Sequence, residues 1–184
     1  MTIGALHEPM GHPKVQGFLD RVPAVYAAAD SSEGFQNRSH RDMGTFQHSW
    51  GPTVVPKCFG LLDPAQAPTT LSLWDDLESV AAFAYHGAHG EAMGKRKEWF
   101  ESHSAPTYVA WWVDDVTNLS WQEAADRLDY LHEHGSTPRA FNFVKPFGED
   151  GEPRILDAAL VKSKFQANAA LQLQPVAGGQ QETI

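Results

Sequence analysis

The sequence predicts an α+β sandwich, in which helices cover one face of an antiparallel sheet. The first observation is the β-rich or alternating pattern of residues 69–74, 108–113 and 140–147, which is typical of half-buried strands. The second is the helical spacing of apolar residues in the segments between such runs. The third is the aromatic run VAWWV at residues 109–113, whose side chains would point to both faces of the sheet. We therefore expect the second face to be buried too, most simply in a homodimer.

The N-terminal elements are predicted from short signals. Residues 3–6 could form a very short strand. Pro13 opens a helix, since proline is favoured at the first helical position, and Pro23 falls inside the same apolar pattern and predicts a kink. Residues 35–50 are compatible with an extended strand or a hairpin, and residues 63–68 with a loop.

The central helix lies between two of the predicted strands and begins at Asp75, which precedes a glutamate by three residues as in a capping box. At 100° per residue, one of its faces is mostly apolar yet carries His89 and Arg96. Burying either side chain is costly unless it finds a partner. Two interpretations stay open. The first is a satisfied structural hydrogen bond with an arginine that reaches the rim, and the second is a pocket that these residues line together with Tyr85 and Trp99.

The opposite face of this helix holds three glycines, Gly87, Gly90 and Gly94. Each costs roughly 1 kcal/mol of helix stability relative to alanine. We expect either that a backbone or a ligand lies close against this side, or that the helix is broken near residues 87–90.

The C-terminal part is predicted from clearer signals. The pattern S-x-x-E at residues 120–123 is a capping box, and it predicts a helix that ends at Gly135. Residues 155–173 are predicted as a further helix, and the final GGQQETI as a disordered tail. We therefore divide the chain into a domain at residues 1–153 and a C-terminal helical extension and tail at residues 154–184.

Composition excludes several classes of function. The 184 residues suffice for one domain with a substantial core. The net charge of −9 argues against nucleic acid as a partner. The single cysteine, Cys58, allows no disulfide within the chain and is typical of a reducing compartment. The N-terminus shows no signal-peptide pattern, and no apolar run approaches the ~20 residues that span a membrane, so we expect a soluble cytoplasmic protein.

Motifs that would identify a reaction are absent from the sequence. His86 and His89 have ligand-like spacing, but they would point in different directions on a helix and no third ligand completes a set, so we expect no metal site. Cys58 has a lysine beside it but no identifiable base, which argues against a nucleophile. There is no nucleophile elbow, phosphate loop or dinucleotide-binding pattern.

A set of aromatic and ionisable side chains remains, and it suits a mostly apolar site for a small molecule. A neutral histidine there could remove a proton from a phenol or an activated carbon acid, and an arginine could hold the resulting oxyanion. For any single aromatic residue, filling of the core is the alternative. The set is His48, Trp50, Trp74, Tyr85, His89, Arg96, Trp99, His103, Trp111 and Trp112.

The segments HPKVQGFLDRVPAVYAAADSSEGF, LSLWDDLESVAAFAYHGAHGEAMGKRKEWFE, YVAWWV and SWQEAADRLDYLHEHGSTPRAFNF follow one another in an order that resembles a bacterial family of unassigned function. That family belongs to the dimeric α/β-barrel superfamily, which includes antibiotic-biosynthesis monooxygenases and haem-degrading enzymes. The resemblance covers about residues 8–147. It implies a ferredoxin-like antiparallel sheet with helices on one face, paired across a homodimer as a dimeric α/β barrel. The positions that match the family pattern are Trp74, Tyr85, His89, Arg96, Trp99, Phe100, Trp111 and Trp112.

Three departures from that family indicate altered pocket walls, as in a specialised biosynthetic enzyme. The first strand is short. Residues 35–59 diverge, with Asn37 in place of an expected aromatic residue and an added stretch that begins at Trp50. The residues from Arg154 onward are extra.

Two functional hypotheses follow. The first is an enzyme that oxidises a small apolar or aromatic, natural-product-like substrate in a cofactor-independent, monooxygenase-type reaction. His89 would be the base or orienting group and Arg96 the anion stabiliser, with Tyr85 beside them. A variant of it is an isomerase, cyclase or lyase that uses the same base. The second is a binder of haem or of a hydrophobic metabolite without turnover, because nine histidines make an axial ligand available.

Overall fold

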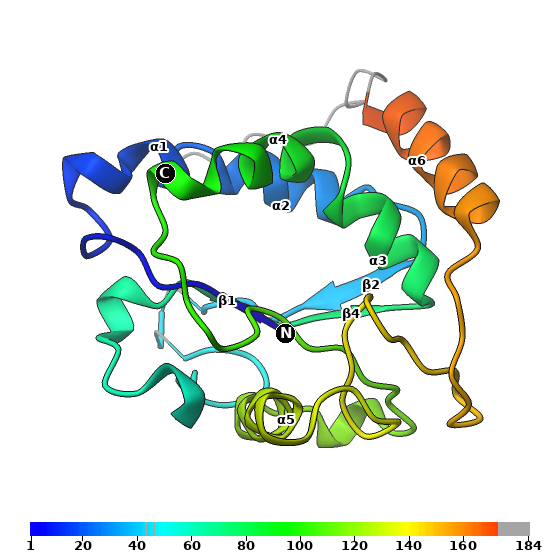
Figure 1. The fold of residues 1–184 in the computed structure, drawn as a ribbon. Helices are drawn as coiled ribbons and strands as arrows, with labels where there is room; N and C mark the ends of the chain where they lie inside the picture. Colours follow the sequence, from blue (N-terminus) through cyan, green and yellow to red (C-terminus); the bar gives the residue numbers. More distant parts are fainter. Residues whose placement is uncertain (43, 46, 173–184) are drawn as a thin grey trace.

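The computed structural model describes residues 1–42, 44, 45 and 47–172. It confirms the α+β class (Figure 1). The strands are β1 (Thr2–Ile3), β2 (Phe35–Arg38), β3 (Thr69–Thr70) and β4 (Ser72–Trp74). The α-helices are α1 (Gln16–Leu19), α2 (Val22–Asp30), α3 (Leu77–Ala84), α4 (Gly87–Lys95), α5 (Trp121–His134) and α6 (Ala158–Gln172). The 3₁₀ helices are η1 (Pro13–Val15), η2 (Lys57–Phe59), η3 (Pro64–Gln66), η4 (Arg96–Glu98) and η5 (Val116–Asn118).

The strands form two small antiparallel sheets rather than one. β1 pairs with β3, and β2 pairs with β4 with an irregularity between Phe35 and Asn37. Of the strand or hairpin predicted at residues 35–50, the first part is the strand β2, and an antiparallel bridge between Arg41 and His48 pairs the described residues that follow it. These two sheets do not close into a barrel within the described residues.

The strands predicted at residues 108–113 and 140–147 are wrong. The two segments lie side by side, and a single bridge at Phe141 joins them through backbone hydrogen bonds of 2.8 and 3.0 Å. Further along, the N–H of Phe143 donates to the hydroxyl of Tyr108 at 3.2 Å. Because a side chain takes the place of a strand carbonyl there, the ladder does not continue.

Helices lie on both faces of the strands, which corrects the expectation that they cover one face. Figure 1 shows α1 to α4 on one side and α5 on the other. A core cluster joins Ile3, Leu71 and Val109 to Trp121 and Leu128 of α5. The second face is therefore covered within the chain, and its burial does not require the homodimer that the aromatic run led us to expect.

The capping box at the start of α5 is confirmed in its main contact. The hydroxyl of Ser120 accepts the N–H of Glu123 at 3.1 Å, which satisfies one of the free amides of the first turn. The Glu123 carboxylate instead pairs with Arg127 within the helix. The helix ends at Gly135, whose φ of 71° favours glycine.

The single central helix that we predicted is instead two helices. Asp76, not Asp75, caps α3, and its carboxylate accepts the N–H of Ser79 at 2.7 Å. After Ala84 the backbone leaves the helical conformation, and α4 begins at Gly87, whose φ is 56°. Of the two expectations for the glycines, a broken helix is confirmed.

The first predicted helix also divides. Pro23 stands in the first turn of α2 and begins a helix instead of kinking one, because its missing N–H has no partner to lose at that position. The short strand expected at residues 3–6 is β1, one residue earlier. The predicted GGQQETI tail lies outside the described residues.

Candidate functional site

The junction between α3 and α4 forms an elbow that brings His89 against the end of α3. We define the elbow as residues 85–87. His86 has an extended backbone, with φ −133° and ψ 172°. Gly90 is needed beside it, since a Cβ at that position would lie 2.8 Å from the carbonyl oxygen of Tyr85. The close approach of a backbone, the second expectation for the glycines, is thus also confirmed.

The His89 imidazole is held by a hydrogen bond across this elbow. Its Nδ1 lies 2.7 Å from the carbonyl oxygen of Ala84. A carbonyl only accepts, so Nδ1 carries the proton and Nε2 carries the lone pair of the neutral ring. Burial lowers the pKa of His89, against the opposing effect of the Ala84 carbonyl. Among the described residues, the hydrogen bond of this imidazole runs through Nδ1 and not through Nε2. The geometry provides a neutral imidazole with one basic nitrogen available.

A chain of aromatic rings leads away from this imidazole. Phe83 lies 4.9 Å from the His89 ring, Trp74 lies 5.2 Å from Phe83, and Phe35 lies 5.1 Å from Trp74, all between ring centroids. The rings come from α3, β4 and β2, and each is partly exposed rather than sealed in the core. The structure therefore connects Trp74 to His89 through Phe83, and Phe83 is the ring that contacts the imidazole.

A second group of aromatic rings includes Tyr85, the first residue of the elbow. Tyr85 and Tyr108 both lie against Phe143, with centroids 6.1 and 5.5 Å away. Burial raises the pKa of Tyr108 to about 12, and contact with the Tyr85 hydroxyl acts in the same direction. The Tyr108 hydroxyl therefore keeps its proton at neutral pH and can donate it in a hydrogen bond.

Arg96 and Trp99 belong to other parts of the structure. The exposed Arg96 guanidinium donates to the carbonyl of Met93 at 3.1 Å and so caps the C-terminal end of α4, where a cation is favourable. Trp99 is buried in a cluster with Leu6 and Val15. The four-residue pocket of Tyr85, His89, Arg96 and Trp99 is therefore not assembled by a single helix face.

His48 and Trp50 lie near α5, away from the elbow. The His48 ring meets Trp121 edge-on at 6.1 Å, and its buried Nδ1 has no partner among the described residues. Burial lowers the pKa of His48, and the positive charge of Arg41 adds to this effect. Trp50 has a φ of 66°, a strained value for a bulky residue, and its carbonyl accepts the N–H of Trp121 at 3.1 Å.

The remaining predicted residues pack against other side chains. The exposed His103 stacks on the buried Phe59 at 4.3 Å. Trp111 packs on the core beneath the guanidinium of Arg127, 5.5 Å away. Trp112 donates its indole N–H to the carbonyl of Phe147 at 2.9 Å.

Neither a metal centre nor a reactive thiol emerges from the described residues. No group of three or more histidine, cysteine or carboxylate side chains there could hold a metal ion. The pKa of Cys58 is raised to about 12, first by burial and then by Asp129, which accepts the backbone N–H of Cys58 at 2.8 Å. The thiolate needed for nucleophilic attack is therefore scarce at neutral pH. Among the helices of this part of the chain, none has the length and apolarity to cross a membrane.

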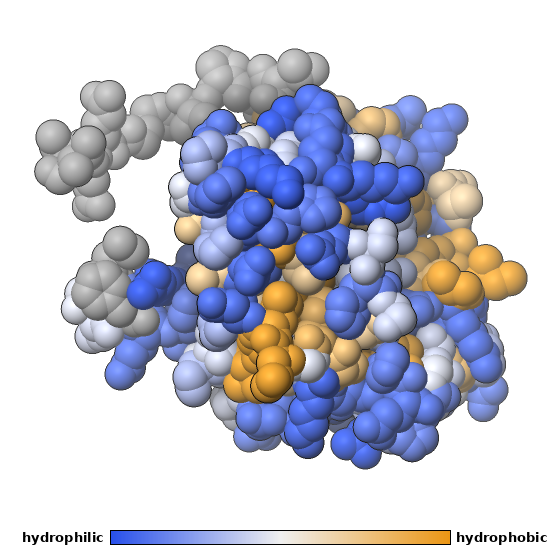
Figure 2. All heavy atoms as spheres, turned by 60° about the vertical axis from the view of Figure 1, so that its left-hand side comes forward, coloured by the Kyte–Doolittle hydropathy of each residue, from blue (hydrophilic) through white to orange (hydrophobic). Residues whose placement is uncertain are grey.

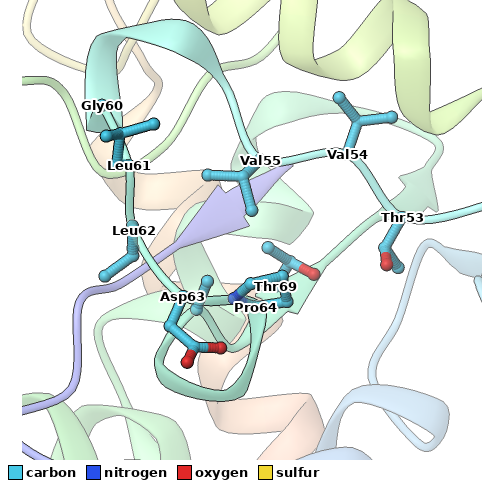
Figure 3. A pocket seen from close by; sticks show the side chains of 10 residues that line it. Thr53, Val54, Val55, Gly60, Leu61, Leu62, Asp63, Pro64 and Thr69 are labelled. Atoms are coloured by element: carbon cyan, nitrogen blue, oxygen red, sulfur yellow. The ribbon is translucent and has the colours of Figure 1, made fainter.

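An open groove of about 830 Å³ lies elsewhere, along the loop before β3 (Figure 3). Its carboxylate, Asp63, sits at one end apart from Val54 and accepts the N–H of Ala65 at 2.8 Å, which caps η3. Leu61 on its rim is fully exposed. In Figure 2 the left-hand side of Figure 1 is turned toward the reader, and apolar residues, in orange, lie at the surface of this face. The groove carries none of the predicted site residues, and its carboxylate is engaged in capping η3.

Sequence reasoning found His89 and Trp74 but missed the rings that connect them and the tyrosine partner. Phe83 fell on the glycine face of a continuous helical wheel, and Tyr108 was assigned to a strand. The usable signal was the triplet of glycines, which indicated that the wheel should be interrupted.

Comparison with known proteins gives one match. A family model described as "Domain of unknown function (DUF3291)" matches residues 1–157. Neither the curated proteins nor the solved structures contain a match.

Proposed function

Since the chain belongs to the family of the domain of unknown function DUF3291, we propose its function from its own side chains: an enzyme that oxidises a small apolar or aromatic molecule, with His89 as the base. The observation that carries this proposal is the hydrogen bond of 2.7 Å between Nδ1 and the Ala84 carbonyl. It fixes the neutral tautomer whose Nε2 can accept a proton. The ring of Phe83 supplies an apolar surface against the imidazole, and Trp74 extends that surface on the other side of Phe83.

The proposed reaction needs no cofactor when the substrate itself supplies the electrons. For an anthrone, Nε2 removes a proton from the ring CH₂, and the resulting enolate passes one electron to O₂. The two radicals combine to a hydroperoxide, which loses water and leaves a quinone carbonyl. The balance is CH₂ plus O₂ giving C=O plus H₂O, and the imidazolium returns its proton to the leaving water. Lowering of the His89 pKa by burial keeps the ring in its basic form at neutral pH.

Tyr85 and Tyr108 are the proposed donors to a substrate oxygen. Tyr108, like any tyrosine, is protonated at neutral pH, and burial raises its pKa further, to about 12. A neutral donor stabilises an enolate oxygen without adding a charge to the site. We assign Arg96 no part in this step, because its guanidinium is engaged at the end of α4.

Two substitutions at one position separate base from scaffold. In His89→Asn, the amide nitrogen stands where Nδ1 stood, so the bond to Ala84 can form while Nε2 is gone. In His89→Gln, a polar atom stands near the Nε2 position, but the Nδ1 donor is lost. We expect His89→Asn to melt like the wild type and to lose about 10²- to 10⁴-fold in kcat. We expect His89→Gln to lose activity and stability together.

The assay follows oxidation of anthrone by absorbance together with uptake of O₂. His134→Asn is the matched control, because His134 is an exposed histidine whose Nδ1 also bonds a carbonyl, that of Tyr130 at 3.1 Å. A folded His89→Asn variant with wild-type activity would exclude the base. Equal conversion of the probe under nitrogen would exclude oxidation and leave isomerisation or elimination by the same base.

The same free nitrogen supports the alternative of a haem binder without turnover. His89 would be the axial ligand, and haem would supply a coloured iron centre. Titration with haemin tests this: a Soret shift in the wild type that His89→Asn abolishes supports binding, and no Soret change removes it.

A ferredoxin-like arrangement and a homodimer are also proposals. They are supported by the resemblance of the segments in residues 8–147 and by the antiparallel pairings of β1 with β3 and β2 with β4. Because α5 already covers the second face, any homodimer must use a surface other than the one that the aromatic run suggested.

A further inference from the structure

Helix α6 docks onto the domain through polar side chains. Its buried residues within the described chain are Lys164 and Asn168, with 7% and 4% of their surface exposed. Two of its large apolar residues, Leu160 and Leu171, are exposed, whereas Phe165 is half-buried. A buried lysine is costly unless paired, so the partners of Lys164 specify the docking position of the helix.

The partners of α6 lie at the start of α3. The Lys164 ammonium is 2.9 Å from a carboxylate oxygen of Glu33 and 3.3 Å from one of Asp76, the residue that caps α3. The side-chain oxygen of Asn168 accepts the N–H of Glu33 at 2.9 Å. These contacts tie α6 to both the cap of α3 and the turn that follows α2.

A second anchor precedes α6. The Glu78 carboxylate, which is 2% exposed, pairs with Arg154 and accepts the N–H of Asp157 at 3.1 Å. Since Glu78 lies in the first turn of α3, the chain entering α6 is fixed to the same end of that helix.

The middle of α6 reaches the elbow at the other end of α3. Phe165 stacks on the His86 ring at 4.1 Å, with 24° between the planes. A small cavity of about 50 Å³ lies between α6 and the elbow, and Phe83 lines it together with His86 and Phe165. Phe83 is also the ring that packs on His89. Phe165 of α6 therefore faces the same cavity as Phe83, and Phe83 packs on the imidazole.

We propose that α6 is a strap that positions His89, with Lys164 holding the start of α3 and Phe165 bracing the elbow. The hydrogen bond from His89 to Ala84 spans that elbow, so any change in the angle between α3 and α4 changes its geometry. α6 begins at Ala158, directly after the residues that the family model matches. In this chain, therefore, the extension after the family domain supports the site. This inference rests on the proposed function only in naming His89 as the reacting group.

The test reads the His89 imidazole directly, by NMR titration of the full chain, with its signal identified from its absence in His89→Asn. In Phe165→Ala, we expect the pKa of His89 to rise toward its ordinary value and the fraction of the Nδ1–H tautomer to fall. Leu160→Ala is the matched control, because it shortens an exposed side chain of the same helix. It should leave both readings unchanged.

Lys164→Gln is the milder variant and decides the matter if Phe165→Ala does not fold. It should shift the His89 signal in the same direction, and Lys164→Arg should restore it. Folded variants whose His89 pKa and tautomer equal those of the wild type would overturn the strap. On anthrone, both variants should lower kcat by up to about 10²-fold, as displacement of a base by about 1 Å does.

The two proposals fail separately. If the wild type does not oxidise the probe but Phe165→Ala still shifts the His89 signal, the strap stands and the oxidation fails. If the wild type is active and neither reading moves in the variants, the enzyme stands and the strap fails.

Discussion

The buried pair of Glu78 and Arg154 gives the sharpest prediction about stability. Glu78 is almost fully buried, and its oxygen has two donors, the Arg154 guanidinium and the Asp157 N–H. Arg154→Met keeps the apolar stem and removes the charge, which leaves a buried carboxylate with one donor. Breaking a buried pair in this way costs about 3 to 5 kcal/mol. Because the Arg154 side chain is 34% exposed, water can reach its place, and we expect about 2 to 3 kcal/mol.

The measurement is unfolding by heat and by urea. For a chain of this size, each 1 kcal/mol lowers Tm by roughly 2 to 4 °C, so Arg154→Met should melt roughly 4 to 12 °C below the wild type. The double variant with Glu78→Gln should recover part of this loss, because no uncompensated charge then remains buried. Arg139→Met, at an exposed arginine over Tyr130, is the control and should cost less than about 1 kcal/mol. Two results would refute the reasoning: a decrease in the free energy of unfolding of less than about 1 kcal/mol in Arg154→Met, or a double variant that is less stable than Arg154→Met.

Three further predictions follow. The pKa of His89 lies below its ordinary 6.5 in the folded chain, so the imidazole of the unfolded chain is protonated at a higher pH than that of the folded chain. The free energy of unfolding should therefore decline as pH falls from about 6.5 through the folded pKa. Urea titrations should show a smaller decline in His89→Asn. Cys58, with its pKa raised to about 12, should resist iodoacetamide at pH 8 in the folded chain and react once urea unfolds it, and rapid alkylation of the native chain, read by mass, would contradict this. Sedimentation at micromolar concentration should show a homodimer, and a monomer would end that proposal.

The sequence predicted those features of the fold that depend on local chemistry. Ser120 capped its helix as expected, and Gly135 ended it, because each acts through neighbouring backbone groups. The strands predicted at residues 108–113 and 140–147 form only isolated bridges, because their pairing depends on distant partners: Tyr108 bridges Thr2, and its hydroxyl accepts the N–H of Phe143, 35 residues away. The pattern of β-rich residues contains no information about that competition.

The docking of α6 was unpredictable for a related reason. The sequence predicted a helix at residues 155–173 but not the face that it buries: Leu160 and Leu171 are exposed, and the helix turns Lys164 inward. The free energy of burying this lysine is acceptable only because Glu33 and Asp76, far away in the sequence, meet at one point. Hydropathy patterns rank lysine as a surface residue and contain no information about ion pairs between residues that are distant in the sequence.

The state of His89 shows how the broken helix and the chemistry depend on each other. In a continuous helix the carbonyl of residue 84 would accept the N–H of residue 88. The break at Gly87 releases that carbonyl, and the imidazole of His89 takes it with Nδ1. In the sequence the glycines are a cost in helix stability and the histidine is a candidate site residue, but in the structure they belong to one arrangement. Without the break, the Ala84 carbonyl could not fix the tautomer, and Nε2 would not be left as the basic nitrogen. Because Gly87 has a φ of 56°, which alanine adopts only under strain, Gly87→Ala acts on the geometry of the break without touching the imidazole.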